Sequence, residues 1–158
     1  MAAGDQRIAK IVLDERTVVR RNENVEHERA VAIADLLEEN SFTPVSGTRG
    51  PFRLHLGIEE NRLVLDIADK RDRRRERVLL PLTPFRSLVK DYFLICESYY
   101  SAVRSANPAR IEAIDMGRRA LHDEGSELLR ERLAEHVSVD FNTARRLFTL
   151  LCVLHIRG

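Results

Sequence analysis

The segment AIDMGRRALHDEGSELL, residues 113–129, concentrates ionisable side chains in one stretch with a helical pattern. At 100° per residue, Asp115, Arg118 and His122 fall on one flank of that helix, beside an apolar line. Histidine titrates near neutral pH and arginine holds oxyanions in a bidentate fork, so this flank could bind an anion or support proton transfer. Ordinary ion pairing of Asp115 with an arginine three or four residues along, with the imidazole half covered, explains the same pattern without a site.

The apolar line of the same helix contains two glycines. It consists of Ile114, Gly117, Leu121, Gly125 and Leu128, which should form the packed side. Each glycine lowers helix propensity by about 1 kcal/mol relative to alanine, a cost that close approach of a neighbouring element could offset. Alternatively, Gly125 kinks or divides the helix.

A second polar group, made by Arg53, His55 and Asp66, lies on two predicted strands. A tight turn at residues 60–61 would place His55 directly across from Asp66. A carboxylate opposite an imidazole could orient it for acid–base chemistry. A simple cross-strand ion pair is the alternative.

Arg145 and Arg146 lie near the start of the last predicted helix, where the helix dipole disfavours cations unless an acidic group pairs with them. They are therefore candidate anion or partner contacts. His27 and His136 belong to predicted helix ends, and His155 fits a core position. None has metal-ligand spacing, so we expect neither a metal nor a cofactor.

The run KRDRRRER, residues 70–77, has six basic and two acidic side chains and could contact phosphates. It lacks interleaved aromatic residues for base stacking, which favours a solvated connector of a hairpin. The chain contains no zinc-protease motif, nucleophile elbow or phosphate-binding loop. These observations argue against nucleic acid as a partner.

Length and composition indicate one globular domain spanning residues 1–158. The formal net charge of +1 argues against wholesale attraction to nucleic acid or an anionic membrane. Cys96 and Cys152 lie in apolar helical patterns and should be reduced, buried thiols. The first residues contain no apolar signal segment, and the longest apolar stretch, residues 147–156, is about half of a membrane span. We therefore expect a cytoplasmic protein without membrane contact.

Hydrophobic periodicity changes along the chain from strands to helices. Apolar residues alternate through 52–58 and 62–68, which should pair as strands, and residues 40–51 should be the longest loop. Thr83 and Pro84 should open a helix, with Thr83 as its cap. Asn107 should start a second helix, and Asp140 should cap the last one. The predicted strands are about 7–13, 52–58, 62–68 and 76–80, and the predicted helices about 25–39, 84–104, 108–135 and 140–156.

This order predicts an α+β fold. An antiparallel sheet of three to four strands should be covered on one face by the helical C-terminal half. The last helix is apolar nearly all round from Leu147 onward and should therefore be central.

Several long blocks carry a resemblance to a known family, and they stand in the order LLEENSF, GPFRLHLGI, RLVLDI, PFRSLVKDYFLICESYY, IEAIDMGRRALHDEGSELLRERL and TARRLFTLLCVLH. Over roughly residues 8–156 the chain resembles uncharacterised protein family 0262 of alphaproteobacteria. The resemblance implies a small bacterial cytoplasmic protein. It carries over no catalytic residue.

Three functions remain open at this point. The favoured one is a non-enzymatic interaction or regulatory domain with a protein partner or with a second copy of itself, for example as a homodimer. A small hydrolase or transferase acting on an anionic substrate, with a histidine acid–base and an arginine clamp, would need a concave pocket. Weak nucleic-acid binding through 70–77 would need steep salt dependence. The candidate binding residues are Asp115, Arg118, His122, Arg53, His55, Asp66, Arg145 and Arg146.

Overall fold

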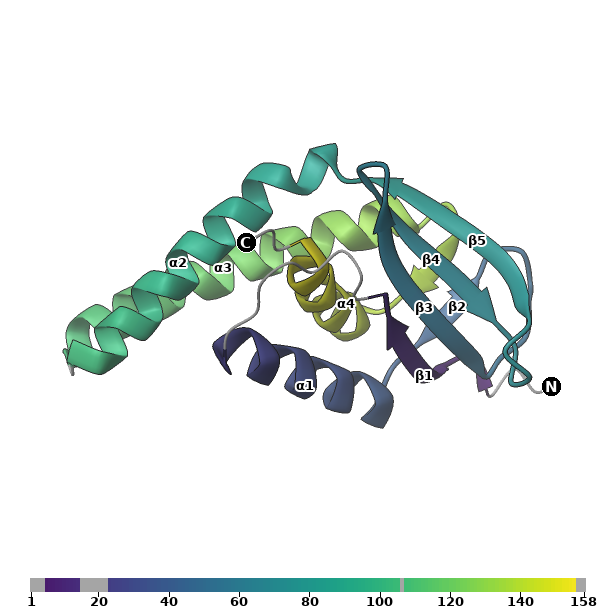
Figure 1. The fold of residues 1–158 in the computed structure, drawn as a ribbon, viewed down its shortest axis with the longest axis horizontal. Coiled ribbons are helices and arrows are strands. Elements are labelled where there is room, and N and C mark those ends of the chain that lie inside the picture. Colours follow the sequence, from purple (N-terminus) through teal and green to yellow (C-terminus); the bar gives the residue numbers. More distant parts are fainter. Residues whose placement is uncertain (1–4, 15–22, 106, 156–158) are drawn as a thin grey trace.

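The computed structural model describes residues 5–14, 23–105 and 107–155. A sheet lies at one side of the molecule, the hairpin of α2 and α3 extends to the other, and α4 lies in the middle (Figure 1). The elements in chain order are β1 (Ile8–Leu13), α1 (Glu23–Glu38), β2 (Phe42–Pro44), β3 (Phe52–Glu59), β4 (Arg62–Ala68), β5 (Arg74–Pro81), α2 (Arg86–Ser105), α3 (Pro108–Leu133), β6 (Val137–Val139) and α4 (Phe141–His155). The predicted α+β class is confirmed.

The main sheet has the strand order β1-β3-β4-β5, and β3, β4 and β5 are antiparallel. Glu60 and Asn61 connect β3 to β4 with φ angles of 51° and 61°, the left-handed conformation that a two-residue hairpin turn requires. The predicted register is confirmed, and all six apolar side chains of its core face are buried: Leu54, Leu56, Ile58, Leu63, Leu65 and Ile67.

β1 departs from the predicted antiparallel sheet, because it pairs with β3 in parallel. Parallel neighbours need a long crossover connection. The chain between them contains α1 and supplies it. The sheet is therefore mixed, although most of its pairing is antiparallel.

A second, two-stranded sheet pairs β2 with β6. The prediction of one continuous loop over residues 40–51 is therefore wrong for Phe42–Pro44, and the predicted helix 108–135 ends at Leu133, before β6. Each of these strands has three residues, too few to show a period of two. Their pairing with a segment distant in sequence is what makes them strands.

Two of the three predicted helix starts are confirmed, and the cap predicted at Thr83 is wrong. Thr83 is not a cap, because a short 3-10 turn begins at this residue and Leu82 precedes it without a side-chain cap. The predicted starts at Asn107 and Asp140 are confirmed. Asn107 Oδ1 accepts from the Arg110 amide at 3.2 Å, and Asp140 Oδ1 accepts from the amide three residues later at 2.8 Å.

α4 lies at the centre of the molecule, as its apolar pattern predicts (Figure 1). It packs against α1 and α3 and touches β3. α2 and α3 form a hairpin that extends away from the sheet. Cys96 and Cys152 are buried and unbridged, as predicted. Over the described parts of the chain, no helix combines the length and apolarity that crossing a membrane requires.

Candidate functional site

A cavity of about 450 Å³ lies between α1 and the pair α3 and α4, with tyrosines of α2 contributing to its wall. The volume is in the range of small-molecule sites. Its charged wall is divided between elements: α1 supplies the two acids, and α3 and α4 supply four arginines, which are Arg118, Arg119, Arg145 and Arg146.

α3 presents its charged flank to this cavity because its glycines face the other way. A Cβ on Gly117 would lie 2.8 Å from Ile95 Cδ1, and a Cβ on Gly125 would overlap the ring of Phe148. The helix continues through both positions, so the alternative of a kinked or divided helix at Gly125 is wrong. Close approach of α2 and α4 accounts for both glycines.

Asp115 and Arg118 form the intrahelical pair that was the simpler alternative. Asp115 Oδ1 accepts from Arg118 Nη2 at 2.7 Å and from its Nε at 3.1 Å, and Arg119 Nη2 lies 3.0 Å from the other oxygen. The hydrogen bond from Arg118 holds the pKa of the Asp115 carboxyl below its usual value. Asp115 is not part of the cavity wall, so it orients Arg118 rather than facing a ligand.

Glu28 of α1 completes a polar network on the cavity side of Arg118. Its carboxylate lies 3.7 Å from Arg118 Nη1 and accepts hydrogen bonds from Tyr92 at 3.4 Å and Tyr100 at 3.2 Å. The Arg118 guanidinium also lies 4.6 Å from the ring centre of Tyr99. Burial raises the pKa of Tyr100 to about 12, so its hydroxyl stays a donor at neutral pH. Arg118 is thus largely satisfied within the protein.

His122 lines the cavity as a neutral imidazole. Its Nε2 lies 2.8 Å from Thr149 Oγ1, its Nδ1 lies 3.4 Å from Ser126 Oγ, and its ring packs against Tyr92 and Phe148. Burial lowers its pKa to about 4, and the positive charge of Arg145 acts in the same direction. Both ring nitrogens therefore already have hydroxyl partners, and the ring is uncharged at pH 7.

The arginines of α4 are less completely satisfied. Arg145 Nε is shielded from solvent and has no hydrogen-bond partner among the described residues, and an oxygen of the Asp123 carboxylate lies 3.7 Å from it. Arg146 Nη1 donates to the carbonyl of Asn142 at 3.0 Å. Within the described ranges no carboxylate lies within 4 Å of the Arg146 guanidinium. These two guanidiniums keep donor capacity on the cavity side.

Asp35 gives the cavity an unpaired acid on the opposite wall. It is partly buried on α1, two turns after Glu28. Among the residues that the structure describes, none forms an ion pair or hydrogen bond with its carboxylate. The cavity is therefore polarised, with a negative wall on α1 and a positive wall on α3 and α4.

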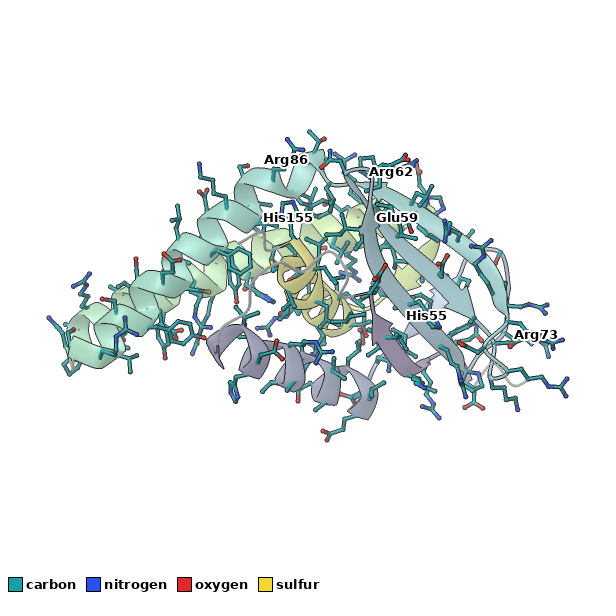
Figure 2. The ribbon with its side chains drawn as sticks, in the orientation of Figure 1. His55, Glu59, Arg62, Arg73, Arg86 and His155 are labelled. Atoms are coloured by element: carbon teal, nitrogen blue, oxygen red, sulfur yellow. The ribbon has the colours of Figure 1, made fainter. Side chains whose placement is uncertain are left out.

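The second predicted group, on the sheet, does not join this cavity. His55 lies opposite Asp66 in the register, as predicted, but its Nε2 bonds Asp72 at 2.8 Å instead. Asp66 accepts two hydrogen bonds from Arg77 of β5, at 2.7 and 3.0 Å. The predicted pairing of His55 with Asp66 is wrong because a bidentate arginine on the other neighbouring strand takes the carboxylate. Figure 2 shows His55 on the sheet; Arg53, two residues earlier on the same strand, is also absent from the cavity wall.

The basic run 70–77 forms a turn and the first half of β5, which begins at Arg74 rather than at residue 76. Asp69 organises the turn by accepting from the amides of Arg71 and Arg73 at 2.9 and 3.0 Å. Arg73 projects at the outer end of the sheet (Figure 2). The prediction of a solvated hairpin connector therefore holds for residues 70–73, whereas residues 74–77 pair in β5.

Sequence reasoning missed the contributions of α1 and α2. Glu28, Asp35, Tyr92 and Tyr100 belong to amphipathic helices in which a charged or aromatic residue is ordinary. No local signal distinguishes them, because their role depends on which helix lies opposite. No group of three or more His, Cys, Asp or Glu side chains in the described part of the chain is arranged to hold a metal ion.

Comparison with known proteins places the whole chain in one family. The family model described as Uncharacterised protein family (UPF0262) matches residues 5–157. The UPF0262 protein of Rhodospirillum rubrum is 64% identical over 148 residues, which cover 94% of this chain and 91% of that protein. A UPF0262 protein of Rhizobium etli strain CIAT 652 is 56% identical over 158 residues and the full length of both chains. That of Paramagnetospirillum magneticum is 58% identical over 153 residues, 97% of this chain and 98% of its own.

No solved structure matches the chain. The family match and the relatives both extend over nearly all of its length, through the sheet as well as the helices that surround the cavity. The chain therefore belongs to the Uncharacterised protein family UPF0262.

Proposed function

We propose that this protein is a regulatory domain that binds a small anionic molecule in the cavity between α1, α3 and α4. The observation that carries the proposal is the pair Arg145 and Arg146, whose guanidiniums line the cavity with hydrogen-bonding capacity left over. Arginine forks match the geometry of carboxylate and phosphate groups. A bound anion would touch α1 as well as α4, and so would hold the two helices together.

Binding without a reaction is favoured over acid–base catalysis by the state of His122. A general base near neutral pH needs a pKa close to the working pH and a lone pair aimed at the substrate. The pKa of His122 is about 4, and both of its nitrogens lie beside protein hydroxyls. In this proposal His122 and Thr149 shape the cavity, while the arginines of α4 hold the ligand.

The test is thermal unfolding with inorganic phosphate and with a series of small carboxylates. At a ligand concentration of about 100 times Kd, binding stabilises the folded state by about 2.7 kcal/mol. For a chain of this size this corresponds to a rise in Tm of about 5–10 °C.

The Arg146→Ala variant should lose this rise. Arg132→Ala is the matched control, because Arg132 lies on the last turn of α3 and is absent from the cavity wall. Equal responses of the two variants, or no response of the unmodified protein to any anion of the series, would refute the proposal.

A further inference from the structure

Glu28 pairs with Arg118 across the cavity, but a second pair of opposite charges does not meet. Asp35 on α1 and Arg146 on α4 both line the cavity, yet no oxygen of the first lies within 4 Å of a guanidinium nitrogen of the second. Each is also without another ionic partner among the described residues. A carboxylate and a guanidinium that line one cavity without forming an ion pair can each bind a group of a ligand.

α1 packs along α4, so the segments that carry these two residues lie on adjacent helices. The Ser41 amide, just beyond the end of α1, donates to Thr143 Oγ1 near the start of α4 at 3.0 Å. Asp35 and Arg146 each lie within two helical turns of this anchor. Val31, one turn before Asp35 on the cavity side of α1, is 43% exposed and offers an apolar contact between the charged ends.

We infer that the ligand of the cavity is a small zwitterion, such as an amino acid or an amine-bearing phosphate ester, with its ammonium group at Asp35 and its acidic group at Arg145 and Arg146. This inference rests on the proposed function and narrows it. A ligand with an acidic group alone would satisfy the α4 wall but would bring its negative charge toward Asp35. A zwitterion satisfies both walls, and its ammonium group donates to Asp35, whose carboxylate accepts from no donor among the described residues.

The other acid of the cavity does not compete for the ammonium group. Glu28 already accepts from two tyrosine hydroxyls and lies 3.7 Å from Arg118. Asp35 is therefore the residue that sets the preference between a zwitterion and a simple anion. Asp35→Asn keeps the shape of the side chain and removes its charge.

The experiment compares matched probes by calorimetric titration. The zwitterions are the free L-amino acids and phosphoethanolamine, and the acid-only counterparts are the N-acetyl amino acids and ethyl phosphate. A hydrogen bond between charged groups favours the best zwitterion over its own acid-only counterpart by about tenfold to a hundredfold in Kd.

In Asp35→Asn this preference should vanish, through weaker binding of the zwitterion and tighter binding of the acid-only probe. Arg146→Ala should weaken both probes, and Arg132→Ala should weaken neither. Because the two probes change in opposite directions in Asp35→Asn, partial unfolding of the variant cannot imitate the result.

Two results would overturn the inference: acid-only probes that bind as tightly as their zwitterions, or a preference that survives in Asp35→Asn. Either would leave the proposed function intact, provided that an anion still binds and still requires Arg146. If no zwitterion, N-acetyl amino acid, ethyl phosphate or inorganic phosphate binds, both the inference and the proposed function fail.

Discussion

Gly125→Ala should destabilise the protein, although alanine is the better helix former. A methyl group at this position would overlap three atoms of the Phe148 ring, which is fully buried. The ring has little freedom to move, because it also packs edge-on against Tyr92 and His122 with centroid separations of 6.2 and 5.3 Å. Overpacking of this kind costs up to about 3 kcal/mol, and the gain in helix propensity returns about 1 kcal/mol. We expect a net loss of about 2 kcal/mol.

The matched control is Gly117→Ala in the same helix. Its new methyl group would lie 2.8 Å from Ile95 Cδ1, the end of a flexible side chain that is only partly buried. A small rotation of Ile95 removes the overlap, so the gain in helix propensity should leave this variant at least as stable as the parent.

Urea unfolding monitored by far-UV circular dichroism measures the unfolding free energy of both variants. In thermal unfolding, the loss in Gly125→Ala should lower Tm by about 4–8 °C. If Gly125→Ala is as stable as the parent, or if both variants lose the same free energy, the packing of α3 on α4 deduced here is incorrect. That packing also determines which flank of α3 lines the cavity, so the same result would refute the assignment of the cavity residues on α3.

Three further predictions concern the groups that hold the cavity in place. Burial lowers the pKa of His122 from 6.5 to about 4, so the unfolded chain takes up a proton at a higher pH than the folded one. The stability that the neutral imidazole contributes is therefore complete above about pH 6.5, and about 3 kcal/mol of it is lost as the pH falls toward 4. Over that range the difference in unfolding free energy between the parent and His122→Asn should shrink rather than stay constant. Asn40→Ala removes the hydrogen bonds of this side chain to the amide and carbonyl of Ile8, at 2.7 and 2.9 Å. It should lower the free energy of unfolding, measured by chemical denaturation, by about 2–4 kcal/mol. A decrease below about 1 kcal/mol would mean that the amide and carbonyl of Ile8 find other partners. Asp140→Ala removes the cap of α4 and should cost about 1 kcal/mol, with Asp140→Asn close to neutral; equal losses in the two would point to the charge rather than the cap.

Much of the fold follows from local patterns. The alternation through residues 52–67 and the short turn at residues 60–61 are sufficient for the register of β3 with β4, because a strand with one buried face cannot shift by one residue without exposing its apolar side. Asn107 and Asp140 mark helix starts because a cap acts on amides only two or three residues away. Both glycines of α3 pack against neighbouring helices, as the predicted inward line requires, but the other buried side chains of this helix, Ser126, Leu129 and Leu133, lie beside that line rather than on it.

Other features could not be predicted because they depend on partners distant in sequence. Whether β1 runs parallel or antiparallel to β3 depends on the route of the chain through α1, and the six residues of β2 and β6 become strands only by meeting each other. His55 and Asp66 lie in register as predicted, yet each bonds a different residue, since Arg77 arrives on a third strand.

The sequence by itself therefore determined the α+β class, the central place of α4 and the flank of α3 that carries Asp115, Arg118 and His122. Only the tertiary structure decided that Arg118 is satisfied by Asp115 and Glu28, that His122 is neutral, and that Asp35 lines the same cavity as the arginines of α4. The reason is physical. Periodicity and capping act over one or two helical turns, whereas the charge and hydrogen bonding of a cavity depend on side chains that converge from helices far apart in the chain.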